Sequence, residues 1–335
     1  MEFGAFPASR PRRLRQNPKI ADLVRETHLN LKDLVLPLFI KGQVGEKQPI
    51  KSMPGHFQIP ISCLSEEIEE IVKLGIGSVI LFGVPPKKDP LGSDSYSDEG
   101  IVQQAIKKIR TVSKDLLIIS DICFCEYTDH GHCGVLCSSN GHYDIDNDET
   151  LKLLVKQAIS HAKAGADVIA PSGMIDGMVG TIRLGLDQAG FSHLPILSYS
   201  VKYNSAMYGP FRAAAEGAPT FGDRSSHMMD TANGMEGLKE AFLDLQEGAD
   251  MIMVKPAHAY LDMIYRVKAA HPAVPLGAYH TSGEFAMIKA AAEKGWVNEK
   301  KAALEVLRGI KRAGADFIIT YYAKEFASWG EHSLY

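Results

Sequence analysis

The chain has 335 residues, of which 45% are hydrophobic and 23% charged, and its formal net charge is −4. This near-neutral balance gives no bulk attraction to nucleic acid or to an anionic membrane, and no apolar run is long enough to cross a bilayer. The first residues lack the basic stretch and apolar core of a secretory signal. We therefore expect a soluble cytoplasmic protein that binds neither nucleic acid nor membrane.

Residues 1–30 precede the first strand-like run and are basic between Arg10 and Arg15. One interpretation is a frayed terminus, and the other is an arm that packs on a neighbouring subunit. The rest of the chain, residues 31–335, has a length that α/β barrels commonly reach as one domain. We expect an N-terminal arm followed by a single catalytic domain.

Eight short apolar runs follow along the chain. They lie at 33–40, 77–84, 116–123, 167–172, 194–200, 250–256, 275–282 and 316–322. Continuous apolar strands of this kind are typical of a parallel sheet covered on both faces. Most of the intervening segments have helical spacing, as in 147–164, where an Asn/Asp cap stands before Glu149.

Three joints between these segments share one pattern, a glycine followed at once by an apolar strand. They are residues 164–170, 247–253 and 313–319, with a looser copy at 73–80. Glycine takes the left-handed conformation that ends a helix. Repeated helix–glycine–strand units predict parallel strands with crossover helices, and eight strands of this kind predict closure into a (β/α)₈ barrel. The alternative is an open doubly wound sheet, which the absence of an early G-x-G-x-x-G disfavours.

Polar residues stand where these predicted strands end, which is where barrels of this kind place their catalytic groups. From the third strand to the eighth they are Asp121 and Cys123, Ser172, Tyr199 with Lys202, Lys255, Tyr279 with Ser282, and Tyr321. Because six strands contribute to one rim, we expect the active site there.

Lys255 follows the apolar run 251–254 and precedes Pro256, so a strand should carry it into the barrel mouth. Burial disfavours an ammonium group and lowers its pKa, and a neutral lysine can attack a ketone to form an imine. The alternative is a lysine that reaches a carboxylate at the rim. Lys202 lies two residues beyond the fifth run and faces the same rim, where each cation should lower the pKa of the other.

Cys123, Cys125 and Cys133 lie within the segment DICFCEYTDHGHCG. Three soft ligands favour zinc, and an open fourth position is typical of a catalytic zinc site. The alternatives are buried free thiols, or a closed structural site completed by His132 or Cys137. Cys63 is far away in the sequence, and we expect it to be a packing residue.

Arg212 and Arg224 flank a stretch rich in glycine, proline and alanine at 209–222. Its irregular composition predicts a loop or lid above the site, and two arginines there indicate a substrate that carries a carboxylate. The alternative is a pair of solvated surface charges.

Together these motifs resemble the porphobilinogen synthase family, also called 5-aminolaevulinate dehydratase. The resemblance covers nearly the whole chain, with long matches in DICFCEYTDHGHCG, SYSVKYNSAMYGPFR, EGADMIMVKPAHAYLD, GAYHTSGEFAM and RAGADFIITYY. It implies a lyase that condenses two molecules of 5-aminolaevulinate, with loss of two waters, to the tetrapyrrole precursor porphobilinogen. Family members commonly form homo-octamers built from dimers, in which the N-terminal arm of each subunit packs on its neighbour. Residues 1–30 would then form this arm.

The resemblance also implies roles for individual residues. Lys255 and Lys202 look like the Schiff-base lysines of the propionate and acetate sides, Arg212 and Arg224 like the acetate-side carboxylate clamp, and Ser282 and Tyr321 like the propionate-side carboxylate ligands. Asp121 and Ser172 would lie near the propionate-side amino group, with Asp121 as a proton acceptor, and Tyr279 would line the substrate pocket.

The three cysteines match the zinc ligands of the zinc-dependent branch, where the metal would deprotonate the acetate-side amine. Glu236, three residues after Asn233, matches a carboxylate that some members use for an allosteric magnesium. The alternative for Glu236 is an ordinary acid in the first turn of a helix.

Three positions depart from the family pattern. Gly173 stands where Asp is usual, Met178 where Arg is usual, and Met228 where a Gln commonly binds the acetate-side carboxylate. Loss of that amide costs about 0.5–1.5 kcal/mol, so we expect weaker acetate-side binding. Two other functions remain open: a class I aldolase, which needs one lysine and no zinc, and a non-catalytic zinc-storing or regulatory protein.

Overall fold

The centre of the molecule is a ring of parallel strands, seen in a computed structural model that describes residues 4–42, 44–139 and 142–329. The ring contains β1 (Leu34–Lys41), β4 (Ser78–Val84), β5 (Leu117–Ile122), β8 (Val168–Pro171), β9 (Leu197–Lys202), β10 (Met251–Lys255), β11 (Leu276–His280) and β12 (Phe317–Thr320). Neighbours pair in the order β8-β5-β4-β1-β12-β11-β10-β9. A parallel bridge between Ile169 and Ile196 joins the two ends of this order. The predicted (β/α)₈ barrel is therefore confirmed, and each of the eight predicted runs overlaps one strand.

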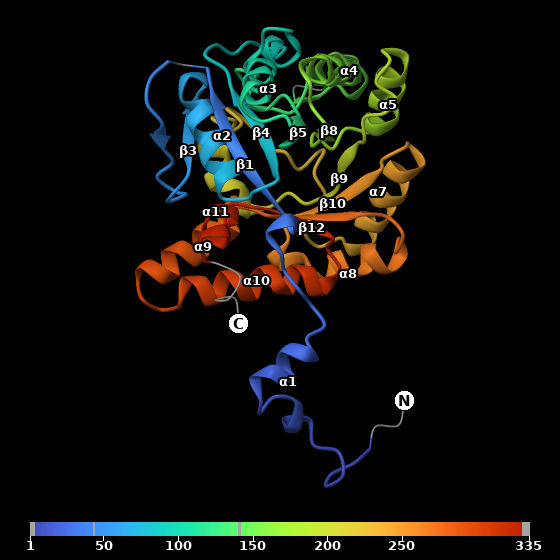
Figure 1. The fold of residues 1–335 in the computed structure, drawn as a ribbon. Coiled ribbons are helices and arrows are strands. Elements are labelled where there is room, and N and C mark those ends of the chain that lie inside the picture. Colours follow the sequence, from blue (N-terminus) through green and yellow to red (C-terminus); the bar gives the residue numbers. More distant parts are fainter. Residues whose placement is uncertain (1–3, 43, 140–141, 330–335) are drawn as a thin grey trace.

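Helices surround the ring (Figure 1). They are α2 (Leu64–Lys73), α3 (Ile101–Val112), α4 (Asn147–Ala164), α5 (Met178–Gln188), α7 (Gly234–Gln246), α8 (Leu261–Ala270), α9 (Ser282–Glu293), α10 (Glu299–Ala313) and α11 (Ala323–Trp329). Every residue of β1 is buried, as expected for a parallel strand covered on both faces. No helix among the described residues combines the length and the apolar character needed to cross a membrane.

The described residues also form shorter elements. They are β2 (Gln48–Pro49), β3 (Phe57–Pro60), β6 (Leu136–Ser139), β7 (His142–Ile145), α1 (Pro18–Leu23), α6 (Gly209–Ala214) and the short 3₁₀ turns Pro11–Leu14, Leu31–Asp33, Ile61–Cys63, Ser93–Tyr96, Ala206–Tyr208 and His258–Tyr260. Of these elements, α6 lies at the candidate site, and so does the loop after β5 that carries the cysteines.

The predicted glycine joints have the expected backbone. Gly165, Gly248 and Gly314 have φ angles of +106°, +102° and +122°, and each comes directly between a helix and the next strand. The helix predicted over 147–164 is α4, and its N-cap Asp146 accepts a hydrogen bond from the backbone N–H of Glu149 at 3.0 Å. Local sequence signals therefore set these boundaries.

The predicted end of the fifth strand was wrong. The fifth run was expected to end at residue 200, with Lys202 beyond it, but β9 extends through Lys202. Its last residues pair with β10 after a register shift between Ile252 and Val254. After this shift β9 pairs with β10 as far as Lys255, the last residue of β10, so Lys202 lies within a strand.

The N-terminal segment stands apart from the barrel. None of residues 4–30 is buried, and α1 lies well away from the ring of strands (Figure 1). Several of its apolar side chains are exposed, including Phe6 and Leu23 at 74% and 84%. The segment therefore contributes little to the barrel core.

Candidate active site

The two lysines lie side by side at the carboxyl ends of neighbouring strands. Lys202 ends β9, Lys255 ends β10, and the two residues are paired in the strand register. Each residue is only 5% exposed. Their ammonium nitrogens lie 5.8 and 5.0 Å from the ring centre of the same residue, Tyr199. Both amines therefore lie near the same ring, at buried positions.

Aromatic rings surround the amine of Lys255. Its Nζ lies 4.2 Å from the ring centre of Tyr279, 5.1 Å from that of Phe211 and 5.3 Å from that of Tyr208. Burial, and then the charge of Lys202, lower the pKa of Lys255 to about 7. A large fraction of this amine is therefore neutral near pH 7, which is the form that attacks a carbonyl carbon.

Lys202 connects the lysine pair to a buried carboxylate. Its Nζ donates a hydrogen bond to the carbonyl oxygen of Ser172, and the hydroxyl of Ser172 donates to Oδ2 of Asp121 at 3.1 Å. The other oxygen of Asp121 is buried without a hydrogen-bond partner among the described residues. Burial, and then the charge of Glu126, raise the pKa of the Asp121 carboxyl, so this group can accept a proton near neutral pH.

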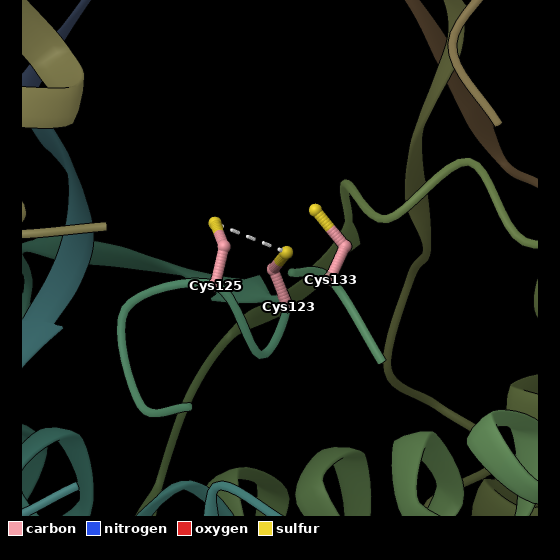
Figure 2. Close-up of side chains that lie close together, drawn as sticks. All are labelled: Cys123, Cys125 and Cys133. Carbon is pink, nitrogen blue, oxygen red and sulfur yellow. Dashed lines mark hydrogen bonds between the residues drawn. The ribbon is translucent and has the colours of Figure 1, made fainter. Parts of the chain in front are cut away.

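Three buried cysteines face the same region from the loop after β5. The sulfur atoms of Cys123, Cys125 and Cys133 lie within 4.8 Å of one another, and those of Cys123 and Cys125 are 3.5 Å apart. Figure 2 shows all three sulfurs turned toward the same space. Zinc–sulfur bonds of about 2.3 Å in tetrahedral geometry would place the sulfurs about 3.8 Å apart. The cluster therefore has the chemistry and the size to hold one metal ion.

Neither proposed fourth ligand joins this cluster. Nε2 of His132 makes a hydrogen bond with the carbonyl oxygen of Phe221 at 3.0 Å. Cys137 lies in β6. Among the described residues, the group that could hold a metal ion consists of Cys123, Cys125 and Cys133 and does not include Cys137. The described residues thus form a three-ligand site, which matches the open arrangement. Cys63 is distant and packs against the barrel core, as predicted.

The two arginines lie on the segment that covers the barrel mouth. Arg212 is half-buried on α6, and Arg224 is 4% exposed, so the alternative of solvated surface charges is wrong for Arg224. Nη2 of Arg224 donates to the carbonyl oxygens of Gly131, at 2.8 Å, and Gly217. The stretch 209–222 was predicted to be a loop, but its first six residues form α6, because Pro210 suits the first turn of a helix.

Three hydroxyl groups lie at the carboxyl ends of β11 and β12. Ser282 begins α9, and its Oγ accepts a hydrogen bond from the backbone N–H of Phe211 at 2.9 Å. Tyr321 follows β12, and its hydroxyl lies 3.1 Å from that of Tyr279. All three side chains are buried, so these hydroxyls are shielded from bulk water.

Several residues of the site were not predicted. Phe211 and Tyr208 form part of the aromatic wall around Lys255, and the hydroxyl of Tyr208 donates to the carbonyl oxygen of Lys255 at 3.2 Å. Glu284 accepts hydrogen bonds from the backbone N–H groups of Thr281 and His258, which tie the ends of β11 and β10 together. The T-x-x-E pattern of a capping box was a signal for Glu284.

The departures from the family pattern lie at or near the site. Met228 is buried and packs with the three cysteines and Tyr208. Gly173 follows Ser172, and a Cβ placed there would lie 3.2 Å from Cγ1 of Ile175. Met178 is buried in the first turn of α5. The acetate side of the predicted site therefore has an apolar wall at Met228.

Glu236 lies in the first turn of α7, as predicted. Its Oε2 accepts a hydrogen bond from Nδ2 of Asn233 at 3.0 Å. It lines a cavity of about 350 Å³ together with Asp144, Asp176, Asp230 and Glu240. This cavity also contains Met228 in its wall, so it lies beside the cysteine cluster.

The chain is similar to known proteins over nearly its whole length. Residues 8–329 match the family model described as delta-aminolevulinic acid dehydratase. Delta-aminolevulinic acid dehydratases of Halalkalibacterium halodurans and Staphylococcus epidermidis are each 52% identical over 320 residues, covering 96% of this chain and 96% and 98% of those proteins.

A crystal structure of delta-aminolevulinic acid dehydratase (porphobilinogen synthase) from Toxoplasma gondii ME49, in complex with the reaction product porphobilinogen, superposes with a TM-score of 0.92. It is 42% identical and covers 96% of this chain and 91% of that one. By this similarity in sequence and fold, the chain belongs to the delta-aminolevulinic acid dehydratase family.

Proposed function

We propose that this chain condenses two molecules of 5-aminolaevulinate to porphobilinogen, holding one on Lys255 and the other on Lys202. The observation that carries this proposal is the pair of buried amines at matching positions of two neighbouring strands. Each lysine amine that adds to a ketone forms an imine and releases one water, which accounts for the two waters lost. Both lysines then leave as free amines: a substrate amino group displaces one, and the other is eliminated with a proton after the new carbon–carbon bond forms. The wall of rings around Lys255 excludes bulk water, which favours the imine.

The polar groups around the lysines would orient the two substrates. Arg212 and Arg224 would bind the carboxylate on the acetate side, because guanidinium groups bind carboxylates through paired hydrogen bonds. Ser282 and Tyr321, with Tyr279 beside them, would bind the carboxylate on the propionate side. Asp121, which is hydrogen-bonded to Ser172, would accept a proton near the propionate-side amino group.

Cys123, Cys125 and Cys133 would hold a zinc ion, because their donor set and spacing fit this metal. When bound, zinc would favour the deprotonated, nucleophilic form of an amine at its open position. The chain itself keeps the cluster buried and next to Arg224, whose guanidinium joins the backbone of the cysteine loop at Gly131 to that of Gly217.

Three further expectations complete the proposal. Glu236 and the acidic cavity around it would bind an activating magnesium ion, which a magnesium titration of activity tests. The exposed apolar side chains of residues 4–30 would be covered by a second subunit in a homo-octamer, which a solution mass measurement tests. A cytoplasmic location follows from the clustered cysteines, because such thiols are kept reduced there.

Borohydride trapping with 5-aminolaevulinate tests the central proposal. Reduction should attach the substrate to Lys255, identified by peptide mass spectrometry, and Lys255→Met should abolish both this adduct and pyrrole formation in a colorimetric assay. Absence of an adduct on wild-type Lys255 would refute the Schiff-base mechanism. A lysine adduct without pyrrole would favour an aldolase, and a zinc-loaded protein with neither would favour a storage or regulatory role.

A further inference from the structure

Glu216 has an unusual backbone conformation at the end of α6. It follows the C-cap residue Ala215 and has a φ angle of +51°. Glycine or asparagine usually takes this left-handed position after a helix, because a side chain is disfavoured there. Gly217 comes next in the chain, yet it is Glu216 that adopts the left-handed angle. This indicates that contacts of Glu216 stabilise the conformation.

Those contacts come from the barrel. Oε1 of Glu216 accepts hydrogen bonds from Nε2 of Gln58 at 3.0 Å and from Nζ of Lys41 at 3.3 Å. The carbonyl oxygen of Glu216 accepts one from Nζ of Lys88 at 2.5 Å. Partial burial opposes the charged carboxylate, but the hydrogen bonds from Gln58 and Lys41 outweigh it and lower the pKa of Glu216. We call these four residues the Glu216 clasp.

The clasp residues are themselves held firmly. Lys41 ends β1, and its Nζ also donates to Oε1 of Gln58 at 2.8 Å and to Oε1 of Gln48 at 2.9 Å. Nε2 of Gln58, in β3, also donates to the carbonyl oxygen of Ala214 at 2.8 Å. The end of α6 is thus fixed through both its backbone and the side chain of Glu216.

On the other side, the same segment packs tightly on the cysteine loop. A Cβ at Gly217 would lie 2.9 Å from the carbonyl oxygen of Cys125, and one at Gly131 would lie 2.2 Å from that of Ala218. The carbonyl oxygen of Gly217 also accepts a hydrogen bond from Arg224. Any shift of residue 216 is therefore transmitted to the backbone that supports Arg224.

We propose that Glu216 is a positioning residue for recognition of the substrate carboxylate. The clasp holds the segment 209–224 against β1 and β3, so that Arg212 and Arg224 face the barrel mouth. The role of Glu216 is indirect, because its side chain is 47% exposed and its carboxylate is bound by Lys41 and Gln58. This inference rests on the carboxylate-binding roles proposed for the two arginines.

Kinetics of Glu216→Ala and Glu216→Gly test the proposal. Glycine suits the left-handed angle, so Glu216→Gly removes the side chain without a backbone penalty. Both variants should raise the KM for 5-aminolaevulinate roughly tenfold while kcat falls less than about threefold, because ground-state binding is the main loss. Lys41→Met should act in the same direction. The matched control is Glu99→Ala, which removes an exposed carboxylate paired with Lys107 and should leave KM unchanged.

Limited trypsin digestion gives a second measurement that does not need activity. Cleavage after Arg212 and Arg224 should be faster in both Glu216 variants than in wild type and in Glu99→Ala. An unchanged KM and cleavage rate would overturn the proposal, as would a defect in Glu216→Ala that Glu216→Gly lacks. If wild-type protein forms no porphobilinogen, the proposed function fails instead, and the digestion comparison alone then decides whether the clasp holds the segment.

Discussion

Imine formation at Lys255 should depend on pH with a midpoint near 7. Burial and the charge of Lys202 lower the pKa of this amine from 10.5 to about 7, and only the neutral amine is nucleophilic. The rate should therefore rise as the pH rises through 7 and level off above it. At about 1.4 kcal/mol per pH unit, the shift corresponds to roughly 5 kcal/mol in favour of the neutral form.

The size of the effect distinguishes a shifted amine from an ordinary one. With a pKa of about 7, roughly 9% of the amine is neutral at pH 6 and roughly 91% at pH 8, a rise of about tenfold that then levels off. With the ordinary value of about 10.5, the neutral fraction rises about a hundredfold over the same interval and continues to rise.

The assay is the initial rate of borohydride-trapped adduct on Lys255, measured by peptide mass spectrometry. The carbonyl compound is 4-oxopentanoate, which lacks the amino group of 5-aminolaevulinate and so does not titrate in this range. Lys202→Gln removes the second cause of the low pKa, so it should move the midpoint to higher pH. A tenfold rise per pH unit that continues to pH 9 in wild type would refute this reasoning, as would an unmoved midpoint in Lys202→Gln.

Three further outcomes follow from the same structure. Cys125→Ala should lose bound metal and activity, and added zinc should not restore them, whereas chelated wild type should recover both when zinc is added. Elemental analysis and the pyrrole assay check this. Full activity of metal-free wild type would contradict it. Met228→Gln should lower the KM for 5-aminolaevulinate roughly fivefold, because one added hydrogen bond contributes about 1 kcal/mol; an unchanged or higher KM counts against it. Leu307 is fully buried in α10. Leu307→Ala should therefore reduce the free energy of unfolding, measured by urea titration, by about 2–5 kcal/mol. A loss below about 1 kcal/mol would show that the surrounding core fills the cavity and would contradict this prediction.

The sequence alone predicted the barrel because its signals are local. An apolar run of strand length, a glycine that ends the preceding helix and a capping residue such as Asp146 each act within a few residues. Lys255 was found in the same way, since a lysine at the end of an apolar strand is unusual wherever the strand lies. The cysteine cluster is also local, because eleven consecutive residues contain all its ligands.

Only the tertiary structure decided how the residues of the site meet. The register shift that pairs Lys202 with Lys255, and the rings of Phe211 and Tyr208 around Lys255, depend on how strands and loops meet after the barrel closes. The Glu216 clasp joins residues 175 positions apart in the chain. Such contacts follow from the geometry of closure rather than from any local pattern, because the side chains that meet are chosen by the packing of distant segments.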